Sequence, residues 1–114
     1  MQTDAVRVAM GRQRDPRMNQ TERAYGDRLE LMRRAGEVAW YAFEGVKLKL
    51  ADNTFYTPDY AVMRADGQME MHEVKGFWRD DARVKIKVAA DQYPFRFVAV
   101  QKAKGGGWKY EVFE

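Results

Sequence analysis

The sequence predicts a single α+β domain in which helices pack against a mixed β-sheet. Two stretches, 19–35 and 80–93, carry apolar residues at helical spacing, and the segments between and after them have the apolar patterns of strands. A chain of 114 residues is long enough for one core, and it shows no internal repeat or linker. The predicted order of elements is α-β-β-β-α-β-β, which belongs to the α/β or α+β class.

Composition narrows the kinds of site that this chain can carry. It is 46% hydrophobic and 32% charged, which indicates a folded core with a charged surface. The absence of cysteine excludes disulfides, zinc-thiolate sites and thiol nucleophiles, so any metal needs hard oxygen ligands. A net charge of +3 is compatible with a polyanionic partner but does not require one. No apolar run has the length of a membrane span and no secretory signal pattern occurs, which predicts a cytoplasmic protein.

Residues 1–18 are predicted to form a flexible basic arm that precedes the domain over 19–114. This arm has no sustained apolar period, and its basic residues include Arg7, Arg12, Arg14 and Arg17. An arm that folds back over nucleic acid and a solvated terminus both fit this pattern.

The first helix is predicted to begin at a capping box and to end near Gly36. Asn19 followed by Glu22 is the pattern of such a box. Glu22 also precedes Tyr25 by three residues, which places both on the inward face of the helix. Its carboxylate therefore fits either a cap partner, which is the commoner use, or a group directed into a site.

Strands are predicted to follow this helix. The segment 38–43 is mostly apolar and aromatic, and after Glu44-Gly45 the apolar residues of 46–50 alternate with Lys47 and Lys49. The two outward lysines fit a solvated face or contacts with a nucleic-acid backbone. After a turn at Asp52-Asn53, one strand is predicted over 55–63, irregular at Pro58 because proline lacks the N–H donor.

The turn at 65–67 decides which residues face each other in the next hairpin. If Gly67 adopts the left-handed conformation, a three-residue loop forms, and counting outward places Asp59 directly opposite Glu73. A two-residue Asp-Gly turn would instead pair Asp59 with Val74, with the two carboxylates on opposite faces. The first register brings the Cβ atoms of the acids to about 5 Å, close enough to share one cation.

Two opposed carboxylates repel each other unless a cation or a proton compensates, so this register favours a functional site. Lys75 follows Glu73 on the same face, because side chains alternate along a strand. His72 falls on the other face. It is the only histidine, and no cysteine exists to complete a triad or a soft-metal site, so we expect a structural role for it.

A second helix is predicted over 80–93 and is ended by Pro94. Basic residues recur at every fourth position near its start, and this stripe fits either a solvated face or a nucleic-acid contact: Arg79, Arg83 and Lys87. Trp78 adjoins the acidic hairpin and is a candidate to stack against a nucleotide. Two strands, over 95–100 and 108–113, complete the domain.

The acidic hairpin resembles the PD-(D/E)XK nuclease superfamily. Pro58-Asp59 and Glu73-Val74-Lys75 lie on adjacent predicted strands, after a helix that carries Glu22 and before a second helix. Three sequence segments also resemble small phage-encoded members of that group: Asn-Gln-Thr-Glu, Tyr-Thr-Pro-Asp-Tyr and His-Glu-Val-Lys-Gly-Phe-Trp-Arg-Asp-Asp-Ala-Arg. The resemblance spans about residues 19–101 and implies a restriction-endonuclease-like fold.

The resemblance implies a divalent-metal-dependent endonuclease that hydrolyses phosphodiester bonds in DNA. Asp59, Glu73, the carbonyl of Val74 and Glu22 would hold Mg²⁺ or Mn²⁺, and Lys75 would orient the attacking water. The DNA contacts would come from Trp78, Arg79, Arg83 and Lys87.

The expected endonuclease activity also suggests a DNA substrate and an oligomeric state. A structure-specific enzyme for branched or junction DNA in phage recombination fits this group, and a homodimer is the simplest way for one site per chain to cut two strands. The alternative is a non-catalytic DNA-binding or phage assembly module that retains the fold, and a structural dimerisation protein is a third possibility.

Overall fold

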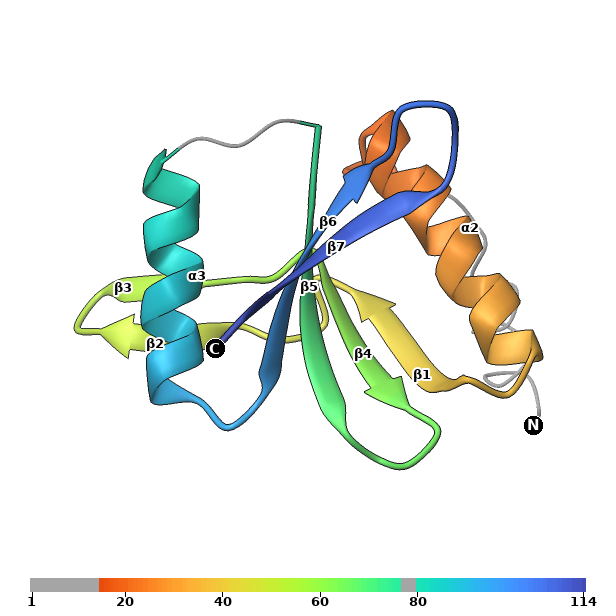
Figure 1. Ribbon diagram of the computed structural model, residues 1–114. Helices are drawn as coiled ribbons and strands as arrows, with labels where there is room; N and C mark the ends of the chain where they lie inside the picture. The colour runs from red at the N-terminus through yellow and green to blue at the C-terminus, as the bar shows by residue number, and fades with distance from the viewer. Residues whose placement is uncertain (1–14, 77–79) are drawn as a thin grey trace.

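A five-stranded mixed sheet forms the centre of the computed structural model, which describes residues 15–76 and 80–114 (Figure 1). The strand order is β1-β4-β5-β6-β7, in which β5 and β6 run parallel and the other neighbours run antiparallel. The bounds are β1 (Val38–Phe43), β4 (Tyr60–Arg64), β5 (Met69–Lys75), β6 (Arg96–Lys102) and β7 (Trp108–Phe113).

The two helices cover opposite faces of this sheet (Figure 1). Helix α2 (Gln20–Arg34) packs against β1 and β5, whereas α3 (Asp80–Gln92) packs against β6, β7 and a small second sheet of β2 (Leu48–Ala51) and β3 (Thr54–Tyr56). Each face has its own apolar core, one around Tyr25 and Leu29 and the other around Ile86 and Ala89. Neither described helix has the length and apolar character needed to cross a membrane. The predicted class, a mixed sheet flanked by helices, is confirmed.

The predicted order α-β-β-β-α-β-β is wrong in the number of strands between the helices, which is five rather than three. One of the two additional strands comes from the break at Glu44-Gly45, which separates β1 from β2. The other comes from the segment 55–63, which was predicted as one strand and is divided between β3 and β4 of different sheets. Pro58 gives the physical reason, because a residue without an N–H cannot continue a sheet ladder. The chain uses the break at 57–59 to cross from the small sheet to the large one.

Helix α2 begins and ends where the sequence predicts. The Asn19 side chain accepts a hydrogen bond from the Glu22 amide at 2.8 Å, and the Glu22 carboxylate accepts one from the Asn19 amide at 2.9 Å, which completes the capping box. Gly36, with φ of 83°, follows the helix end in the left-handed conformation that favours glycine.

A close contact fixes the first turn of α2 to the start of β4. The Tyr60 hydroxyl donates a hydrogen bond to the Glu22 carbonyl at 2.8 Å. Gly26 makes room for it, since a Cβ atom at that position would lie 2.4 Å from the hydroxyl oxygen. Tyr60 directly follows Asp59, so this contact brings the start of the helix to the acidic hairpin.

The β4–β5 hairpin has the predicted three-residue turn. Gly67 has φ of 90°, and the Arg64 amide donates to the Gln68 carbonyl at 2.8 Å. The resulting pairs include Met63 with Met69 and Ala61 with Met71. Regular pairing ends at Tyr60 and His72, one residue before Asp59 would meet Glu73.

Candidate functional site

Asp59 is held between the end of β1 and the second half of β5. Its backbone carbonyl accepts a hydrogen bond from the Glu44 amide at 2.7 Å, and its Oδ2 accepts one from the Val74 amide at 2.8 Å. The pKa of Asp59 is raised to about 8, mainly by burial and then by the charge of Glu73, while the Val74 hydrogen bond acts in the opposite direction. The site therefore disfavours a bare negative charge on Asp59.

Glu73 is buried on β5, and both of its carboxylate oxygens have partners. Oε1 accepts a hydrogen bond from the Tyr56 hydroxyl at 2.6 Å, and Oε2 forms an ion pair with Lys75 Nζ at 3.1 Å. Burial acts to lower the pKa of Lys75, but the charges of Glu73, Asp59 and Glu22 outweigh it and raise this pKa. Tyr56 belongs to β3, so the small sheet orients an acid of the large one.

Glu22 contributes charge to this site, although its carboxylate lies in the capping box. Its charge is among the causes that raise the pKa of both Asp59 and Lys75. Within residues 15–76 and 80–114, no group of three acidic or histidine side chains is arranged to hold a metal ion. The acids brought together are thus Asp59 and Glu73, with Glu22 as a neighbouring charge.

The chemistry of this donor set fits a hard divalent cation. Asp59 and Glu73 offer carboxylate oxygens, and the nearest imidazole, His72, lies on the other face of β5 as predicted. Magnesium is commonly held in proteins by one or two carboxylates, with water and substrate phosphate completing its six oxygens. Two carboxylates are within the number that a magnesium ion commonly takes from a protein.

The residues predicted to contact DNA differ in their surroundings. Arg83 pairs with Glu111 at 2.5 Å, and its guanidinium lies over the Phe113 ring at 5.2 Å, so it has partners within the domain. Lys87 is exposed on α3. The predictions for Trp78 and Arg79 lie outside the described residues.

The basic arm is described only at its end. Arg17 forms ion pairs with Asp15 at 2.5 Å and with Glu44 at 2.9 Å, which ties it to the residue after β1. The arginines predicted earlier in the arm precede the described residues: Arg7, Arg12 and Arg14. The two outward lysines of 46–50 have local contacts: Lys47 lies over the Phe55 ring at 4.6 Å, and Lys49 lies 3.6 Å from the Asp52 carboxylate.

Three residues that shape the site were not predicted from the sequence: Tyr56, Tyr60 and Gly26. Gly26 could have been identified, because it lies inside a predicted helix. A glycine there lowers helix stability by about 1 kcal/mol relative to alanine and usually has a packing reason. Tyr56 and Tyr60 flank the Pro-Asp motif, but their hydroxyl partners lie at least 17 residues away in the chain. No local pattern identifies such partners.

Comparisons with protein-family models, with curated proteins and with solved structures found no match to this chain. Its function is therefore inferred from the residues of the site and their geometry.

Proposed function

We propose that this protein is a divalent-metal-dependent DNA endonuclease of the PD-(D/E)XK type. One observation carries the proposal: the partly buried Asp59 is bonded to the Val74 amide, and the charge of the buried Glu73, which forms an ion pair with Lys75, acts on it. Two acids placed together in a partly buried site cost folding free energy unless a cation compensates. A catalytic metal site would explain why two carboxylates occupy this partly buried position.

The chain's own residues have distinct roles in this proposal. Asp59 and Glu73 would hold Mg²⁺ or Mn²⁺ together with the Val74 carbonyl, and Glu22 would bind the ion directly or through water. An ion bound there polarises the scissile phosphate and lowers the pKa of a bound water. Lys75 would orient the attacking water and offset the negative charge that develops on the phosphate.

The DNA substrate and a homodimer are part of the same proposal. One site per chain cuts one strand, so a double-strand cut or the symmetric resolution of a junction requires two protomers, most simply around a two-fold axis. Lys87, Arg79 and Trp78 remain the proposed DNA contacts. Arg83 is the weakest of the original set, since Glu111 already neutralises it.

One observation favours a second candidate, a DNA-binding module without catalysis. Lys75 lies 3.1 Å from Glu73 and neutralises part of the acidic pair, while the Glu22 carboxylate is occupied by the helix cap. Such a module would bind DNA with a steep salt dependence and would not cleave it in the presence of metal.

The test is a cleavage panel with junction, flap, nicked, duplex and single-stranded DNA in Mg²⁺ or Mn²⁺. We expect wild-type protein to cleave at least one of these, and Asp59→Ala and Lys75→Ala each to lose about 10²-fold or more in rate. Asp52→Ala is the matched control, because the Asp52 side chain is 98% exposed in the β2–β3 turn. Cleavage that survives both site substitutions would show that this site is not the catalyst.

A further inference from the structure

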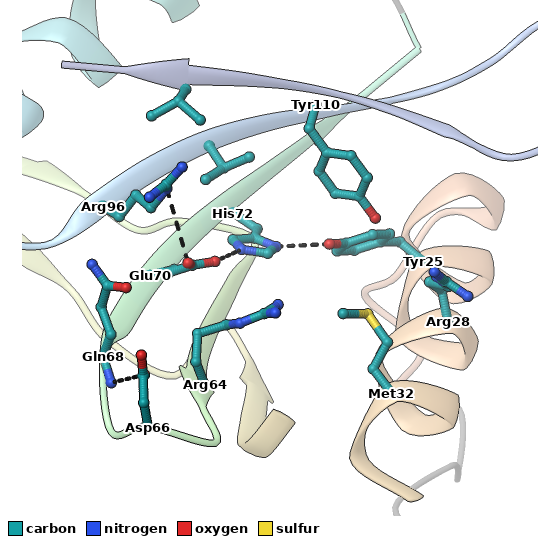
Figure 2. A pocket seen from close by; sticks show the side chains of 12 residues that line it. Tyr25, Arg28, Met32, Arg64, Asp66, Gln68, Glu70, His72, Arg96 and Tyr110 are labelled. Carbon is teal, nitrogen blue, oxygen red and sulfur yellow. Dashed lines mark hydrogen bonds and ion pairs between the residues drawn. The ribbon is translucent and has the colours of Figure 1, made fainter. Parts of the chain in front are cut away.

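A polar hollow lies on the α2 face of the sheet, toward the N-terminal end of β5. Its volume is about 500 Å³, and it is bordered by α2, the β4–β5 turn and the strands β6 and β7 (Figure 2). Ligand pockets in proteins commonly have volumes of about 300–1,000 Å³. The hollow is therefore large enough for a small organic ligand, and it faces away from the side of the sheet that carries Glu73.

A chain of hydrogen-bonded side chains forms the floor of the hollow. His72 Nε2 lies 2.9 Å from Glu70 Oε1, and His72 Nδ1 lies 2.8 Å from the Tyr25 hydroxyl. All three residues are buried. Figure 2 shows the interactions that join Glu70, His72 and Tyr25. Because every member has a partner, the network favours one arrangement of this floor.

The charged groups around the hollow leave a positive excess. Three guanidiniums from three different elements line it, those of Arg28, Arg64 and Arg96, against the two carboxylates of Glu70 and Asp66. Glu70 is bound to His72 and lies 4.0 Å from Arg96, and Asp66 accepts a hydrogen bond from the Gln68 amide in the turn.

Arg28 and Arg64 carry the excess. Within the part of the chain that the structure describes, neither guanidinium has a side-chain hydrogen bond or a close ion pair, although the charge of Arg64 is among the causes that lower the pKa of Glu70. Arg64 extends from its strand toward α2 (Figure 2). The planar guanidinium fork matches phosphate oxygens in two-point hydrogen bonds. Two arginines at the edge of a concave site, neither of them engaged in a side-chain hydrogen bond, therefore favour a phosphate ligand.

An aromatic ring lies beside these arginines. Tyr110 lines the hollow and is 49% exposed, and its ring packs against that of Tyr25 with a centroid distance of 6.4 Å. An exposed ring held in place by another ring is a surface on which a flat nucleobase can stack.

We propose that this hollow binds one nucleotide, with its phosphate on Arg28 and Arg64 and its base against Tyr110. The nucleotide is either a free deoxynucleoside monophosphate or one unit of a single DNA strand, since both present the same phosphate and base. Binding of this ligand in the hollow does not involve Asp59 or Glu73, the acids of the proposed nuclease site.

The experiment is a titration of the full chain, by calorimetry or tyrosine fluorescence, with dAMP, deoxyadenosine, inorganic phosphate and a short single-stranded oligonucleotide. We expect saturable binding of dAMP or the oligonucleotide, weakened about tenfold by Arg28→Gln, by Arg64→Gln and by Tyr110→Ala. Lys104→Gln removes the same charge from the exposed β6–β7 turn and should change affinity less than about twofold. Binding of dAMP identifies a free nucleotide as sufficient, and binding of the oligonucleotide alone identifies the DNA strand.

Three results would overturn the proposal: no saturable binding of either ligand, equal losses in Lys104→Gln and Arg64→Gln, or deoxyadenosine binding as tightly as dAMP. Asp59→Asn separates this site from the nuclease. It should bind the nucleotide like wild type while cleavage is lost, so failure of one proposal leaves the other measurable.

Discussion

The carboxylate of Asp59 accepts a hydrogen bond from the backbone amide of Val74, 2.8 Å away, just beyond the last regular pair of β4 and β5. In a sheet an amide in this position ordinarily donates to a carbonyl of the neighbouring strand. Here a side chain replaces that carbonyl, and this fixes the orientation of Asp59 against β5. The same bond places the Asp59 carboxylate next to Glu73, which precedes Val74, and so it defines the acidic site.

Stability should depend on pH through Asp59. Its pKa is about 8 in the folded protein and 3.8 ordinarily, so between pH 4 and 8 the folded state binds a proton that the unfolded state does not. The free energy of unfolding of the metal-free protein should therefore fall as pH rises through this window, by up to about 1.4 kcal/mol per pH unit from this group. Urea unfolding of wild type at pH 5 and pH 8 measures the effect.

Asp59→Asn should flatten that pH dependence, because the amide does not titrate. Asp52→Asn, which removes an exposed carboxylate, should follow the wild-type curve. If the free energy of unfolding varied with pH identically in wild type and Asp59→Asn, the pKa of Asp59 would not be raised in the folded protein. Added Mg²⁺ should stabilise wild type more at pH 8 than at pH 5, because the ion competes with the proton.

Tyr56→Phe tests whether the small sheet orients Glu73. The substitution removes the hydroxyl that donates to Glu73 at 2.6 Å and leaves the ring in the core. Groups that orient a metal ligand typically contribute about 10- to 100-fold in affinity or activity, so half-maximal cleavage should need about tenfold more Mg²⁺.

Tyr93→Phe provides the matched control for Tyr56→Phe. It also removes a hydroxyl that donates a 2.6 Å hydrogen bond, but to the Lys49 carbonyl of β2. Equal Mg²⁺ requirements in the two variants would mean that Tyr56 has no special effect on the acid.

Gly67→Ala tests the turn that sets the hairpin register. At φ of 90° an alanine is strained, and we expect a loss of about 1 kcal/mol or more in the free energy of unfolding. Gly76→Ala is the comparison, since Gly76 is outside the left-handed region and an added Cβ would have open space. Equal destabilisation of the two variants in urea would argue against a specific requirement at Gly67.

Local signals predicted most of the fold. The capping box of Asn19 and Glu22, the stop at Gly36 and the three-residue turn at Gly67 all involve residues within a few positions of each other, and the structure has each of them. The count of strands failed at two breaks, Glu44-Gly45 between β1 and β2 and Pro58 between β3 and β4. A break in a strand is visible in the sequence, but whether the chain returns to the same sheet depends on packing between distant segments.

The candidate site was predictable only in part, for the same reason. Counting residues from the turn aligned Asp59 with Glu73, although the strand ends one residue earlier and the Asp59 carboxylate turns to the Val74 amide. The hydrogen bond from Tyr56 to Glu73 and the ion pair of Arg83 with Glu111 join separate elements, and no periodicity encodes such contacts.

Binding of Mn²⁺ to the free protein at pH 8 tests the central claim most directly, because it requires no knowledge of the DNA substrate. A titration followed by calorimetry should find one ion per chain, with affinity reduced about tenfold or more by Asp59→Asn and by Glu73→Gln and unchanged by Asp52→Asn. If Mn²⁺ does not bind, or if both site variants bind it as wild type does, Asp59 and Glu73 do not form a metal centre.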